Sequence, residues 1–201
     1  MSVGRRGVWI VVAVVVAVVA AAVVGWRLVG RDDGLTDRVS ATLGLTEAFP
    51  DVDTTGLTPA RRRIVDVVRH EYDHKQSGTY YAQGATEPWC ADFVSWTMHE
   101  AGVPLDNPNS GSWRIPGVAT LTDYYRSVGR LRAPSYRPRT GDVVLYETPN
   151  RFRQHTNIVL KVDGDTVTTV GGNEPPTSIS INSYDAATVT GIVGYGVVES
   201  R

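Results

Sequence analysis

One cysteine and one histidine of this chain are placed where they could act together as nucleophile and base. Cys90 is the only cysteine, and it stands at the expected start of a helix, where unpaired backbone N–H groups favour a thiolate. His155 opens an expected strand after a polar loop, whereas His70, His74 and His99 lie on expected helices. An imidazole beside a thiol can take its proton and later return it to a leaving amine. The pair therefore indicates nucleophilic cleavage of an acyl bond.

A third side chain is needed to hold the imidazole in the required tautomer. Two expected strands, 155–162 and 166–170, form a hairpin, so the residue just beyond the second strand returns to the neighbourhood of His155. Asn173 is the candidate for this position. Three aromatic residues are candidates for lining the substrate groove or binding the oxyanion, with packing of the core as their alternative role: Tyr81, Trp89 and Trp113.

A second motif offers different chemistry. Residues 70–74, HEYDH, match the HExxH motif, in which two histidines on one helix face bind zinc and the glutamate acts as a base. The longer form of this motif has a glycine and a third histidine downstream, but Ser77 and Tyr80 occupy those positions. A zinc peptidase is therefore the alternative enzyme hypothesis.

The pattern of apolar residues predicts helices first and strands afterwards. The expected helices are 58–75, which Thr58 would cap, 90–101, and 116–128. The expected strands are 142–146, 155–162, 166–170 and 192–198. Helices followed by a run of strands predict an α+β domain, in which N-terminal helices pack on an antiparallel sheet.

The N-terminal segment is apolar enough to enter a membrane. Residues 7–26 contain no charged side chain and are long enough to cross a bilayer as a helix. Arg5 and Arg6 precede them, so we expect residues 1–6 in the cytoplasm and the rest of the chain outside. The alternative is a signal peptide cleaved near Ala20 to Ala22, which would leave a secreted protein. We expect a stalk at 27–56 and a catalytic domain at 57–201.

The composition excludes some partners. A net charge of -1 gives no attraction to nucleic acid, and a single cysteine excludes an internal disulfide. No internal repeat or second globular domain is visible, and we expect a monomer. The thiol chemistry requires no cofactor and no metal.

Three segments resemble the hallmark blocks of CHAP domains, which are cysteine- and histidine-dependent amidohydrolases and peptidases of papain-like fold, directed mostly at peptidoglycan. The segments are EPWCADFVSWTMHEAGVP at 87–104, RTGDVVLYE at 139–147 and HTNIVLKVDGDTVTTVGGN at 155–173. The resemblance covers about residues 57–199. It implies Cys90 as nucleophile, His155 as general base and Asn173 as the orienting residue, in an enzyme that cleaves amide or peptide bonds of peptidoglycan.

One position departs from the family pattern. Many members have a glutamate two residues before the orienting asparagine, and this chain has Gly171 there. Any carboxylate that assists His155 must therefore be absent or come from elsewhere. The non-enzymatic alternative is a degenerate domain that binds the cell wall without cutting it, although the presence of Cys90, His155 and Asn173 together argues against it.

Overall fold

The computed structural model describes residues 48–175 and 178–198. The compact unit begins at Phe49, before the expected domain start at residue 57. Phe49 packs edge-on against Tyr72 with ring centroids 5.8 Å apart, and Val52 is buried in the core. The last residues assigned to the stalk thus pack on the domain. Residues 7–26 lie outside the described part, and within that part no helix is long and apolar enough to cross a membrane.

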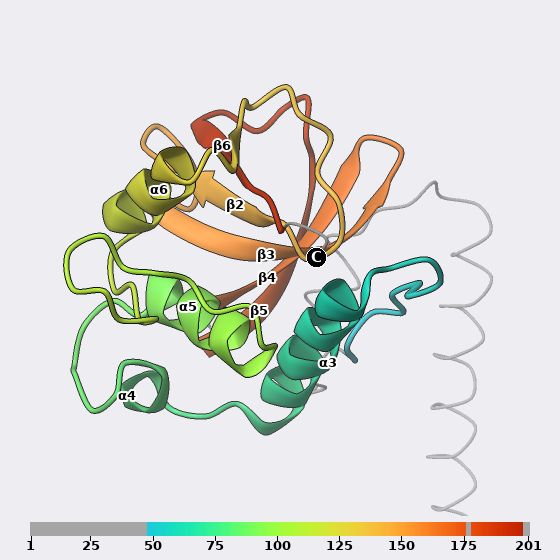
Figure 1. Cartoon of the computed structure of the whole chain (residues 1–201). Helices are drawn as coiled ribbons and strands as arrows, with labels where there is room; N and C mark the ends of the chain where they lie inside the picture. The colour runs from blue at the N-terminus through green and yellow to red at the C-terminus, as the bar shows by residue number, and fades with distance from the viewer. Residues whose placement is uncertain (1–47, 176–177, 199–201) are drawn as a thin grey trace, which may run out of the picture. The chain divides into compact units, whose positions relative to one another are not determined.

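The described helices are α3 (Pro59–His74), α4 (Gly78–Tyr81), α5 (Cys90–Glu100) and α6 (Val118–Ser127). Helix α3 begins as expected, since the Thr58 side chain accepts a hydrogen bond from the Arg61 N–H and Pro59 occupies the first turn. Helix α4 is a single turn of four residues between α3 and α5, where no helix was expected. Helix α5 lies between α3 and α6 (Figure 1) and contacts both of them.

A six-stranded antiparallel sheet follows the helices, which confirms the α+β class. Its strands are β1 (Leu131–Arg132), β2 (Val143–Tyr146), β3 (His155–Asp163), β4 (Thr166–Glu174), β5 (Ser178–Asp185) and β6 (Ile192–Gly196). Their order in the sheet is β1-β6-β2-β3-β4-β5. Two differences from the expected strands matter for the site. Strand β4 continues beyond residue 170 to Glu174, and β5, which the sequence pattern misses, pairs with it along its length.

Two apolar clusters lie on opposite faces of the sheet, because alternate side chains of a strand point to opposite sides. The larger cluster contains Ile158 and Leu160 of β3 together with Phe93 of α5. The smaller one contains Val159 of β3, and Tyr146 and other residues of neighbouring strands. Helix α5 contacts β3 and β4 directly. The fold thereby sets the first residue of α5 against the strands that carry the other site residues.

A buried ion pair joins α3 to the sheet. Arg61 donates hydrogen bonds to Asp142 Oδ1 at 2.8 Å, to the Val198 carbonyl at 3.0 Å and to the Thr140 carbonyl. Both charged side chains are almost fully buried. Arg61 belongs to a run of three arginines, 61–63, and such a run is typical of a solvated face, but the Arg61 side chain is buried. Asp142 also accepts the Arg139 N–H, so it fixes the turn before β2.

We predict that Arg61→Met destabilises the domain by about 3–5 kcal/mol, because it leaves the Asp142 charge buried without its partner. Chemical denaturation followed by circular dichroism measures this loss. Arg62→Met is the matched control, since Arg62 is the exposed neighbour on the same helix turn, and it should change the stability by less than about 0.5 kcal/mol. Equal effects of the two substitutions would contradict the role assigned to the ion pair.

Candidate active site

Cys90 is the first residue of α5 and is almost fully buried. It thus occupies the helix N-terminus that the sequence predicts, where the partial positive charge of the backbone N–H groups stabilises a thiolate. Its thiol is free. The packing of α5 on β3 and β4 brings this thiol to His155, which is the first residue of β3.

His155 has two hydrogen-bond partners on its ring. Nε2 donates to Glu174 Oε1 at 2.7 Å, and the Cys90 thiol is the second partner. Because each imidazole nitrogen makes one such bond, Nδ1 is the atom left for the thiol. The structure therefore brings together the cysteine and the histidine that the sequence singled out.

The surroundings of His155 change its charge at neutral pH. Burial lowers the pKa of this imidazole, but hydrogen bonds and negative charge from Cys90 and Glu174 outweigh burial and raise the pKa to about 9. The ring is therefore protonated at pH 7. An imidazolium beside a thiol generally favours the thiolate, which is the nucleophilic form.

The carboxylate on His155 comes from Glu174, and the contact that we expected from Asn173 is not made. Asn173 lies at a bulge of β4, where the register shifts between Gly172 and Glu174, and its φ of 63° is left-handed. The Asn173 side chain is exposed. A bulge adds one residue and breaks the alternation of side chains, so the next residue turns its side chain towards His155.

Glu174 is held by two strands. While Oε1 accepts from His155, the second carboxylate oxygen accepts from the Asn182 side-chain amide on β5. The carboxylate is almost fully buried. The site is therefore a chain of contacts from Asn182 through Glu174 and His155 to Cys90. Sequence reasoning missed both Glu174 and Asn182, although Glu174 directly follows the residue that it chose.

Gly171 leaves the space that this carboxylate occupies. A Cβ atom on Gly171 would lie 2.3 Å from Asn157 Oδ1 and 2.6 Å from Glu174 Oε1, closer than real atoms approach. The departure from the family pattern at residue 171 and the carboxylate at residue 174 are thus linked. A side chain at 171 and the observed position of Glu174 exclude each other.

Phe152 covers one face of the imidazole. Its ring stacks on His155 with centroids 5.9 Å apart and an angle of 18°. The guanidinium of Arg151 lies 4.4 Å above the centre of the Phe152 ring. These residues belong to the loop between β2 and β3, to which the sequence assigned no role. They limit the access of water to the ring.

Tyr81 and Trp89 pack in the core. The Tyr81 hydroxyl donates to Glu71 Oε2 at 2.6 Å, and the residue is fully buried. Trp89 stacks on Tyr81 with centroids 5.2 Å apart. Because its hydroxyl is already used, Tyr81 does not serve as the expected oxyanion donor. Trp113 is half-buried and stacks on His99 at 4.5 Å.

The geometry of the HExxH motif does not fit a zinc peptidase. In such an enzyme the glutamate acts on a metal-bound water, whereas the Glu71 carboxylate is buried and accepts the Tyr81 hydroxyl. The rings of His70 and His74 stack at 4.0 Å on the surface. Among residues 48–175 and 178–198, no group of three or more potential ligand side chains is arranged to hold a metal ion.

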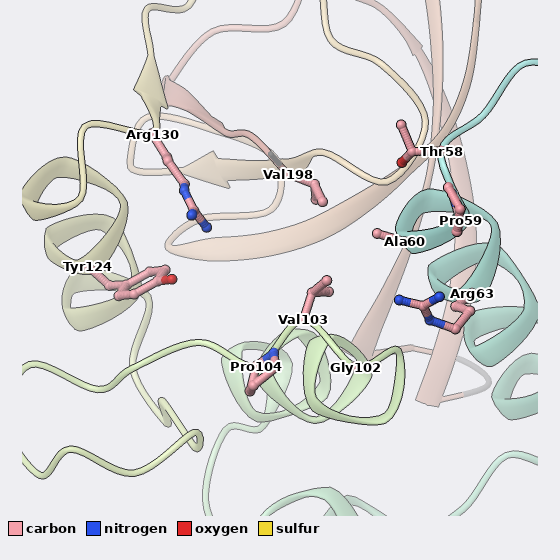
Figure 2. Close-up of a pocket in the computed structure, with 10 residues that line it drawn as sticks. All are labelled: Thr58, Pro59, Ala60, Arg63, Gly102, Val103, Pro104, Tyr124, Arg130 and Val198. Atoms are coloured by element: carbon pink, nitrogen blue, oxygen red, sulfur yellow. The ribbon is translucent and has the colours of Figure 1, made fainter. Parts of the chain in front are cut away.

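A cavity of about 410 Å³ lies at the other end of α5. Figure 2 shows that Arg63 and Arg130 point into it from opposite sides, above Gly102 and Pro104, which follow the helix. None of the site residues lines this cavity. Since an eleven-residue helix is about 16 Å long, the cavity is separate from the Cys90 site.

We predict that Gly171→Ala displaces Glu174 and lowers the pKa of His155 from about 9 towards its ordinary value, because the new methyl group takes the place of the carboxylate. Glu174→Gln should lower this pKa as well. NMR titration of the histidine ring protons measures it. In the unsubstituted protein, the raised pKa stabilises the fold fully below pH 6.5, and this contribution is lost as the pH rises through about 9.

The matched control for this prediction is Gly117→Ala. A Cβ at that position would meet only Thr120 Oγ1, at 3.7 Å, which is ordinary contact. This variant should leave the His155 pKa unchanged. If the His155 pKa is also unchanged in Gly171→Ala, the position of the Glu174 carboxylate does not depend on the absence of a side chain at residue 171.

Comparisons with known proteins find two similar crystal structures and one family model. No curated protein matches the chain. Two crystal structures of Ly7917, the second with the hydrolyzing product of MDP, are similar over 53% of this chain, with identities of 22% and 21% and TM-scores of 0.38 and 0.37. The similarity spans about half of each Ly7917 chain, 51% and 52%. Residues 80–173 match the family model of the CHAP domain, a range that includes Cys90 and His155, and this chain therefore carries a CHAP domain.

Proposed function

We propose that this protein is a cysteine hydrolase that cleaves amide or peptide bonds of peptidoglycan outside the cytoplasmic membrane. The observation that carries the proposal is the set of contacts on His155, whose ring is bonded to the Cys90 thiol and to the Glu174 carboxylate. A nucleophile, a base and an orienting acceptor within hydrogen-bond reach are what acyl transfer requires. The CHAP match supports peptidoglycan as the substrate.

The reaction begins with attack of the Cys90 thiolate on the substrate carbonyl carbon. The carbon–nitrogen bond then breaks, and the His155 imidazolium gives its proton to the leaving amine. Neutral His155 next takes a proton from water, which attacks the thioester and releases the acid and the thiol. Backbone N–H groups at the start of α5, that of Cys90 first, are the donors placed for the oxyanion.

Glu174 has a positioning role in this mechanism. Its bond to Nε2 directs Nδ1 towards the thiol and stabilises the protonated ring, as the acidic or amide partner of a catalytic histidine does. Asn182 in turn fixes the carboxylate. We assign the third position to Glu174, which contacts the ring, in place of Asn173, whose side chain is exposed.

We predict that Cys90→Ala abolishes cleavage, because the reaction then has no nucleophile. The full chain in detergent is incubated with purified peptidoglycan, and mass spectrometry identifies the released fragments and the new amino groups. Iodoacetamide should inactivate the unsubstituted protein, and a chelator should not. His155→Gln should lower the rate by about 10²-fold or more.

Cleavage that persists in Cys90→Ala and stops with the chelator would overturn the proposal in favour of zinc chemistry. A folded, unsubstituted chain that binds peptidoglycan and releases nothing would instead support the binding domain. Asn173→Ala is a useful comparison, since it should retain most of the activity, whereas Glu174→Ala should lose it.

We also propose that residues 7–26 anchor the chain in the cytoplasmic membrane with the catalytic domain outside. Their length and lack of charge support this location. The full chain, expressed in bacteria, should remain in the membrane fraction after alkaline extraction, and protease added to spheroplasts should digest its catalytic domain. A shortened protein in the medium that begins near residue 23 would show a cleaved signal peptide instead.

A further inference from the structure

The helix that begins with Cys90 has no side-chain cap. Its N-cap residue is Trp89, which makes no capping hydrogen bond. Helix starts usually rely on a Ser, Thr, Asp or Asn at this position, whose side chain accepts a hydrogen bond from a backbone N–H of the first turn. Something else must therefore hold this end of α5, where small displacements would change the distance from the sulfur to His155.

The guanidinium of Arg114 contacts residues on both sides of Cys90 in the sequence. Arg114 Nε donates to Asp92 Oδ1 at 2.7 Å, and another nitrogen of Arg114 pairs with Glu87 Oε1. Glu87 stands three residues before Cys90 and Asp92 two residues after it. Arg114 therefore ties the segment that enters the helix to the first turn of the helix itself. Because guanidinium is planar and always charged, it suits such a double contact.

Asp92 is a buried acid that the proposed mechanism does not use. Its side chain is fully buried, and Oδ2 has no hydrogen-bond partner among the described residues. Burial raises the pKa of Asp92 to about 6, although Arg114 opposes this effect. A buried carboxylate needs a partner to stay charged. Arg114 is the partner that the structure supplies.

The contact with Asp92 is one end of a row of contacts along α5. The Ile115 N–H donates to Ser95 Oγ at 3.1 Å, and Trp113 stacks on His99. Positions 92, 95 and 99 lie on one face of a helix. The segment that carries Arg114 is therefore fastened along α5, and its charged contact lies at the end where Cys90 begins.

We propose that Arg114 is a positioning residue for the nucleophile, which takes the place of the missing helix cap by joining Glu87 to Asp92 across Cys90. Through these two contacts it keeps the Cys90 thiol in hydrogen-bond reach of His155. The catalytic consequence rests on the proposed function. The physical consequence does not, because the contact of thiol and imidazole can be measured without a substrate.

The test compares Arg114→Gln with Arg126→Gln, whose arginine makes an exposed pair with Asp123 on α6. In Arg114→Gln the His155 pKa should fall from about 9, because the thiol contributes to raising it. Alkylation of Cys90 by iodoacetamide at pH 7 should slow by about tenfold, and kcat should fall by a similar factor with KM little changed. Arg126→Gln should match the unsubstituted protein.

Two further variants keep the test decisive if Arg114→Gln does not fold. Glu87→Gln removes only the more exposed of the two pairs and should lower the His155 pKa and the alkylation rate by less. Arg114→Lys supplies one point charge and should restore them in part. Folded variants with unchanged His155 pKa and thiol reactivity would overturn the inference. If the His155 pKa and the alkylation rate change although neither the unsubstituted protein nor any variant cleaves peptidoglycan, the inference stands and the proposed function fails.

Discussion

The hydrogen bond between His155 and Glu174 depends on the local geometry of three strands. His155 opens β3, and Glu174 closes β4 after a bulge at Asn173. The carboxylate then needs the amide of Asn182 from β5 and the empty position at Gly171. Together they place one buried carboxylate against one imidazole, and the orientation of that ring towards the thiol follows.

The balance of burial and charge explains why the His155 ring carries a proton. Taking an imidazolium out of water is unfavourable and lowers its pKa, whereas opposite charges close by act in the other direction. Here two potential anions, Cys90 and Glu174, bond to the same ring, and their effect is the larger one. Phe152 adds an apolar cover on the ring face, and in a drier surrounding such charge interactions are stronger. Burial of the site thus strengthens the charge interactions that keep the His155 ring protonated.

Much of this arrangement could be predicted from the sequence. The cap at Thr58, the start of α5 at Cys90 and the hairpin of β3 and β4 all follow from local signals, and the structure confirms them. These signals work because capping residues, glycine turns and apolar periodicity act within a few residues. They were sufficient to predict that Cys90 and His155 form a pair.

The missed features depend on contacts between distant segments. The bulge at Asn173 turns the Glu174 side chain towards His155 in place of the Asn173 side chain. No local sequence pattern marks this bulge, although glycines at 171 and 172 permit backbone conformations that other residues avoid. Strand β5 has only a short alternation, Ile179 and Ile181 between polar residues, and the sequence analysis overlooked it together with Asn182. Glu71 resembled a zinc-peptidase base until its burial against Tyr81 was known. In each case the partner, and not the residue itself, decided the role.

If the domain works outside the cytoplasm, as we propose, its surroundings are oxidising, and the presence of a single cysteine then has a further consequence. Oxidation of a reactive thiol gives a sulfenic acid, which a neighbouring cysteine can convert into a reversible disulfide. This chain has no second cysteine to do so. Its recovery would depend on a small thiol or a reductase supplied by the cell. The near-complete burial of the sulfur, which serves the contact with His155, would then also limit how fast oxidants reach it.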